Sequence, residues 1–86
     1  MSIGEVKAAL REASQLLDQG RTTVEGIGDS LNEAAGFMLA TLHDSRRDEA
    51  EKARKAIAEA VREVKLALRA ITAAQESGNE FEKALG

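Results

Sequence analysis

The chain has 86 residues, enough for one small domain, and an aliphatic composition with two Phe and no Trp, Tyr, Pro or Cys is typical of long helices. A formal net charge of -3 argues against nucleic-acid binding, and the absence of Cys excludes disulfide and thiolate chemistry. We expect no membrane span, because no window approaches about twenty apolar residues, and no signal peptide, because the first residues lack an apolar run.

A first helix is predicted from residue 3 to about residue 42. Ser2 with Glu5 three residues later forms a capping-box pattern at its start. Two series with a period of seven then follow, which places both on one stripe of a helix. The first series has a large side chain at every step and consists of Ile3, Leu10, Leu17, Val24, Leu31 and Met38. The second series has mostly small side chains and consists of Val6, Ala13, Gly20, Ile27, Ala34 and Thr41.

Glycines at 20, 26, 28 and 36 interrupt this stretch, and each costs about 1 kcal/mol relative to Ala in a helix interior. One alternative is a turn at residues 26–30, which would divide the first half into two helices. The apolar series keeps its period across the glycines, so the sequence favours one long helix that is kinked at most.

A bend is predicted at residues 43–46. Continuing the first series would place Ser45, Lys52 and Glu59 on the stripe, whereas the next apolar series begins at Ala50. Asp44 or Ser45 can cap a new helix, with acidic residues in its first turn. The sequence therefore predicts an all-α antiparallel helical hairpin.

The second helix is predicted over residues 47–76, and it carries an alanine at every seventh position. Ala53, Ala60, Ala67 and Ala74 form this series, and Ala50, Ile57, Val64 and Ile71 form the series beside it. Alanines allow a partner helix to approach closely. We call the contact between the two helices the seam, and we expect it to contain Leu17, Val24, Leu31, Ala53, Ile57, Ala60, Val64, Ala67, Ile71 and Ala74.

Residues 77–86 are predicted to form a short C-terminal tail, because Gly78 is suited to ending a helix. The tail carries Phe81 and Leu85, and it either docks on the hairpin or stays loose.

Charge is unevenly distributed along the chain. Residues 1–44 contain three basic and seven acidic side chains, a balance of -4, and residues 45–70 contain eight basic and five acidic, a balance of +3. Opposite signs attract within one hairpin or between two molecules.

No residue pattern indicates catalysis, a cofactor or a metal site. His43 is the only histidine, and it has no Cys, second His or Glu-X-X-His spacing to complete a site. Gly26 and Gly28 are not followed by the Gly-Lys-Ser/Thr of a phosphate loop. The basic residues of the second helix are interspersed with acids and lack aromatics for base stacking. We therefore expect a protein that is not an enzyme and does not bind nucleic acid.

The apolar surface exceeds what one narrow seam can cover. Leu16, Phe37, Val61 and Leu68 flank the predicted stripes, and we expect them to contact a partner, giving a four-helix assembly with a second copy or another protein. The alternative is that these residues widen the intramolecular seam.

A short chain with two long Ala-rich antiparallel helices and a short tail resembles the ESAT-like, or WXG, proteins of bacterial type VII secretion. The Trp-X-Gly of that family is absent from the bend, which reads Leu42-His43-Asp44-Ser45, and its tail signal is matched in outline by Phe81 and Leu85. The resemblance implies a partner or targeting chaperone that pairs with a larger helical or toxin protein.

The sequence thus predicts a non-enzymatic protein-protein interaction module, either cytoplasmic or secreted by a dedicated system. The alternative is a cytoplasmic coiled-coil homo-oligomer, such as an antitoxin or an assembly scaffold, that is not exported.

Overall fold

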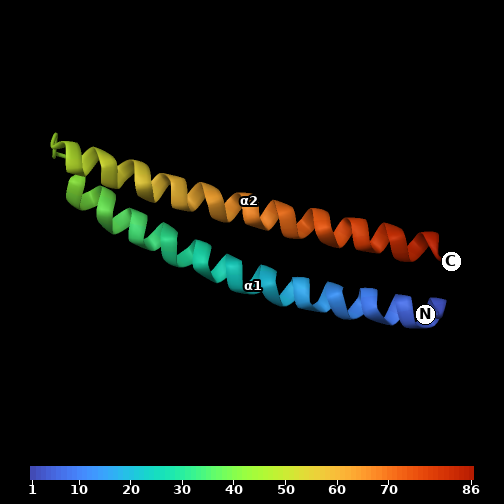
Figure 1. Cartoon of the computed structure of the whole chain (residues 1–86). Helices are drawn as coiled ribbons and strands as arrows, with labels where there is room; N and C mark the ends of the chain where they lie inside the picture. Colours follow the sequence, from blue (N-terminus) through green and yellow to red (C-terminus); the bar gives the residue numbers. More distant parts are fainter.

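The computed structural model describes all 86 residues, and they form two long helices, α1 (Ile3–Leu42) and α2 (Asp48–Ala84). The helices run antiparallel along a rod of 62 × 16 × 16 Å, with both termini at one end and the bend at the other (Figure 1). The predicted all-α helical hairpin is therefore confirmed.

The start of α1 is fixed by the expected cap. The Ser2 hydroxyl oxygen accepts a hydrogen bond from the Glu5 backbone N–H at 3.1 Å, and it lies 3.3 Å from the Glu5 carboxylate, to which it can donate. A serine cap of this kind contributes about 1 kcal/mol to helix stability.

The helix α1 continues through the glycines at 20, 26, 28 and 36, so no turn forms at residues 26–30. Gly28 is the glycine at which the two helices approach each other most closely. A Cβ atom added there would lie 3.2 Å from Cγ1 of Val64, whereas one added at Gly20, Gly26 or Gly36 would meet nothing within 4 Å. Only Gly28 is therefore required by packing.

The bend spans residues 43–47, and the residue that caps α2 is Arg47 instead of the expected Asp44 or Ser45. The Ser45 hydroxyl is occupied inside the turn, where it accepts the Arg47 backbone N–H at 3.4 Å. Arg54 closes the bend from α2, since its guanidinium donates to the Leu42 carbonyl at 2.9 Å and so satisfies a free carbonyl at the end of α1.

The second helix differs from the prediction at its C-terminal end. It runs through Gly78 to Ala84, so most of the expected tail 77–86 is helical. Contacts with α1 offset the cost of Gly78, because Arg11 forms an ion pair with Glu82 at 2.9 Å and Lys7 donates to the carbonyl of Gly86.

The hairpin has almost no interior. Ala50, beside the bend, is the only buried residue at 5% exposure, and all other residues are half-buried or exposed. Neither helix contains an apolar stretch able to cross a membrane. A chain this small gains stability by covering more of its apolar surface.

Candidate protein-binding face

The seam is rotated relative to the predicted one. In α2 one series of half-buried positions recurs in steps of three and four, and it consists of Arg54, Ile57, Val61, Val64, Leu68, Ile71, Gln75, Gly78 and Glu82. Ile57, Val64 and Ile71 are in the expected place, and Ala53 and Ala60 are also half-buried, but Ala67 and Ala74 are exposed.

The seam of α1 is rotated in the same sense. Leu10, Leu17, Val24, Leu31 and Met38 are half-buried as the first series predicts. In the second series Val6, Gly20 and Ala34 are half-buried as predicted. Ala13, Ile27 and Thr41 are exposed, and their neighbours Ser14, Gly28 and Leu42 are half-buried instead. The physical reason lies in α2, because burying Val61 and Leu68 is worth about 1.5–3 kcal/mol each, more than burying alanines.

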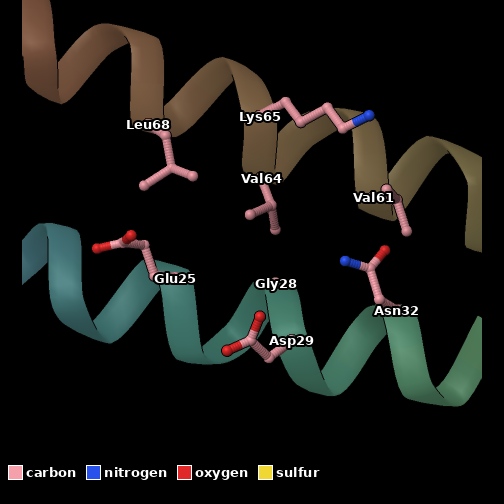
Figure 2. Close-up of a pocket in the computed structure, with 8 residues that line it drawn as sticks. All are labelled: Glu25, Gly28, Asp29, Asn32, Val61, Val64, Lys65 and Leu68. Atoms are coloured by element: carbon pink, nitrogen blue, oxygen red, sulfur yellow. The ribbon is translucent and has the colours of Figure 1, made fainter.

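Figure 2 shows this packing at the middle of the hairpin. Val61, Val64 and Leu68 point from α2 toward α1, where Gly28 leaves room for Val64. Val61 and Leu68 were predicted to contact a partner. They belong to the seam instead, which agrees with the alternative that these residues widen the contact between the two helices. Leu16 and Phe37 are exposed, at 59% and 70%.

The rotation leaves a second stripe on each helix, beside the seam, again in steps of three and four. We call these two stripes together the alanine-rich face. It consists of Ala9, Ala13, Leu16, Gly20, Thr23, Ile27, Ser30, Ala34, Phe37 and Thr41 of α1, and Ala53, Ala56, Ala60, Glu63, Ala67, Ala70, Ala74, Ser77, Phe81 and Ala84 of α2. Glu63 is its only charged residue.

Both stripes lie on the same side of the hairpin. Phe37 and Ala53, from different helices, line one shallow depression, and Ala13 and Ala74 line another. This agrees with geometry, since equivalent heptad positions of two antiparallel helices fall on the same side of their contact.

The opposite side, which we call the charged face, carries the polar contacts between the helices. Arg11 pairs there with Glu82, Arg21 donates to Thr72 at 2.9 Å and to Gln75, and Gln75 donates to Asp18 at 2.7 Å. Polar contacts of this kind fix the alignment of two helices.

The expected attraction between the acidic first half and the basic stretch 45–70 produces no ion pair in the hairpin. Glu25 and Asp29 line a depression with Lys65, but Lys65 extends along α2 and pairs with neither (Figure 2). Arg11 and Glu82 form the one ion pair between the helices.

The hydroxyl groups of the two threonines on the alanine-rich face form hydrogen bonds within α1. The Thr23 hydroxyl donates to the Gln19 carbonyl at 3.1 Å, and the Thr41 hydroxyl donates to the Phe37 carbonyl at 2.9 Å. Because both hydroxyls are bonded to their own helix, the methyl groups add to the apolar surface.

Four large apolar side chains stand exposed on this face: Phe37 at 70%, Leu16 at 59%, Phe81 at 52% and Ile27 at 48%. Ile27 was not predicted to be part of an exposed apolar face because it fits the expected seam, and Phe81 was not because it was placed in a tail. The absence of charge along a second stripe is the sequence signal that could have identified both.

Several polar side chains at the bend bond to their neighbours. His43 lies at the bend, with Nε2 3.1 Å from Asp44 and Nδ1 2.8 Å from the Ala40 carbonyl, and no group of three His, Asp or Glu residues could hold a metal ion. The pKa of Glu51 is lowered, chiefly by its hydrogen bond to Arg54. The same Arg54 bonds the Leu42 carbonyl at the end of α1.

The segment 77–86, which was predicted to be a C-terminal tail with Phe81 and Leu85, is part of the hairpin. Phe81 lies on the alanine-rich face, and Leu85 is half-buried at the end of α2. Comparison of the chain with protein-family models, curated proteins and solved structures finds no match.

Proposed function

We propose that this chain is a non-enzymatic protein-binding module that pairs with helices through its alanine-rich face. The observation that carries the proposal is the contrast between a single buried residue and a nearly uncharged face that exposes Leu16, Ile27, Phe37 and Phe81. Contiguous exposed apolar surface of this kind is typical of interaction sites.

The shape of the face defines the class of partner. Helices pack closely where one of them presents small side chains, and the α2 half of the face is alanine at seven of ten positions. The large residues of the α1 half can enter the grooves of a facing helix. The partner is therefore a protein that presents long helices with an apolar stripe.

The test is photo-crosslinking in the cell that makes the protein, with a photoreactive amino acid in place of Phe37. The matched control replaces Leu39, which is also apolar, lies two residues away on α1, and is exposed outside the alanine-rich face at 43%. We expect a discrete crosslinked product from position 37 and none from position 39. Equal crosslinking at both positions, or none at either, would refute a binding role for this face.

Two cellular settings were expected from the sequence. A role as a partner or targeting chaperone in type VII secretion is supported by the resemblance in architecture alone. The placement of Phe81 and Leu85 in the last turns of α2, where Glu82 is paired with Arg11, favours the alternative of a homo-oligomer that is not exported. Replacing Phe81 and Leu85 by Ala while following the amount of protein outside the cell separates the two, since export depends on them only in the first setting.

A further inference from the structure

The two helices are aligned so that known pairs of residues lie at the same level along the rod. Arg11 is level with Glu82, Arg21 with Thr72, and Gly28 with Val64. These pairs give the level of every other residue of α1 relative to α2.

At matching levels, the α1 and α2 halves of the alanine-rich face are complementary in size. Leu16 is level with Ala74 and Ser77, Ile27 with Ala67, and Phe37 with Ala56. At the open end of the hairpin the large residue belongs to α2 and the small residues to α1. Phe81 is the only large residue in the α2 half, and the α1 residues near its level are the small Ala9 and Ala13.

This complementarity cannot serve the hairpin itself, because both halves face the same way. It becomes a contact when a second copy is stacked on the face by a two-fold axis parallel to the rod. Such an axis keeps every residue at its level and places α1 of one copy over α2 of the other. Each of Leu16, Ile27, Phe37 and Phe81 then meets small residues.

We propose that the occupant of the alanine-rich face is a second copy of this chain, in a four-helix bundle whose two bends lie at the same end. The inference rests on the proposed function and names its partner. In this bundle every neighbouring pair of helices is antiparallel, as in common four-helix bundles.

The one charged residue of the face distinguishes this orientation from the reverse. With bends at the same end, Glu63 is level with Ser30 of the other copy, whose exposed hydroxyl can donate to the carboxylate. With bends at opposite ends, α2 would lie on α2, and Glu63 would be level with Ala70. That orientation leaves the carboxylate against alanine, which is unfavourable.

The distance between helix axes also favours the orientation with both bends at the same end. The reverse orientation packs alanines on alanines between the two α2 helices, and Leu, Ile and Phe on one another between the two α1 helices. Preferred distances between helix axes range over about 8–10 Å with side-chain size, so the two contacts would need different spacings. With bends at the same end, both contacts join a large stripe to a small one and have equal spacing.

The first experiment measures mass in solution over a concentration series, by light scattering and sedimentation equilibrium. The native chain should be a dimer of the 9.2 kDa protomer. Ala67→Glu should weaken dimerisation by about 100-fold or more, because it buries an unpaired carboxylate in each copy. The matched control is Ala73→Glu, an exposed alanine of the same helix outside the face, and it should leave dimerisation unchanged.

Circular dichroism of the same samples verifies that both variants remain helical, which is expected because Glu is a good helix former. Equal weakening by the two variants would overturn the assignment of the face. A native chain that stays monomeric at all concentrations would overturn the dimer, and crosslinking of position 37 to a different protein would then leave the proposed function standing.

The second experiment determines the orientation. The chain has no cysteine, so His43→Cys places a single spin label at the bend. Packed hairpins lie about 10 Å apart, so bends at the same end should give label separations below about 30 Å by electron paramagnetic resonance. A separation close to the 62 Å length of the rod would overturn the proposed axis.

Discussion

Gly26 and Gly28 lie two residues apart in α1 and should respond in opposite ways to the same substitution. Gly26→Ala adds a methyl group that meets nothing within 4 Å. It should gain the helix propensity of Ala, about 1 kcal/mol, and raise Tm by about 4–8 °C. Gly28→Ala has the same gain, but its Cβ would lie 3.2 Å from Val64 Cγ1, and overpacking costs about 1–3 kcal/mol. The net effect at Gly28 should lie between zero and a loss of about 2 kcal/mol.

The assay is thermal and urea unfolding followed by circular dichroism, at one protein concentration because association shifts apparent stability. A double-mutant cycle isolates the contact, since in a Val64→Ala background Gly28→Ala should recover the full gain of about 1 kcal/mol. If Gly28→Ala stabilises the native chain as much as Gly26→Ala does, the two helices do not approach each other at Gly28 and the reasoning is wrong.

Five further substitutions, at four positions, test other parts of the structure. Leu68→Asp should unfold the hairpin and lower its helicity, because the side chain lies in the seam, whereas Phe37→Asp should leave the helical circular dichroism signal intact. Ser2→Ala should cost about 1 kcal/mol of unfolding free energy through loss of the cap, and Ser2→Asp, which keeps a capping oxygen, should not. The lowered pKa of Glu51 means that its bond to Arg54 contributes stability above the ordinary carboxyl pKa of 4.5, and that this contribution is lost as the pH falls through the lowered value. Glu51→Gln should therefore reduce the loss of Tm between pH 6 and pH 3, and an unchanged acid response would show that the pair does not stabilise the bend.

The hairpin itself could be predicted from sequence because its signals are local or strictly periodic. The cap at Ser2 is a short-range pattern, and the change of apolar series between Met38 and Ala50 reveals the bend. The glycines of α1 did not prevent a correct prediction, since the period of seven continues through them. Each of these features is decided within one helix or one turn.

The rotation of the seam could not be predicted in the same way. Each helix carries two adjacent stripes of the same period, and periodicity alone does not say which of them faces the other helix. The choice depends on the summed burial of residues from both helices, in which Val61 and Leu68 outweigh Ala67 and Ala74. Periodicity correctly identified apolar stripes in both helices, but their partners depend on tertiary packing.

The C-terminal end shows the same limit at a single residue. Gly78 has the local properties of a helix end, and the sequence gives no direct sign that Arg11, 71 positions earlier, lies beside Glu82. The ion pair and the packing of Leu85 keep the last turns of α2 helical. Tertiary contact thus overrides a local preference that is worth about 1 kcal/mol.

The alanines of α2 were predicted to pack closely against α1, and two of the four do not. An alanine at every seventh position is suited to close approach by another helix. In the hairpin α1 does not cover Ala67 and Ala74, which are exposed. Ala53 and Ala60 of this series are half-buried, so only close packing along Ala67 and Ala74 needs a further helix. In the two-fold bundle that we propose, an identical chain would supply that helix, and its Phe37 and Ile27 would lie on the alanines of the first copy.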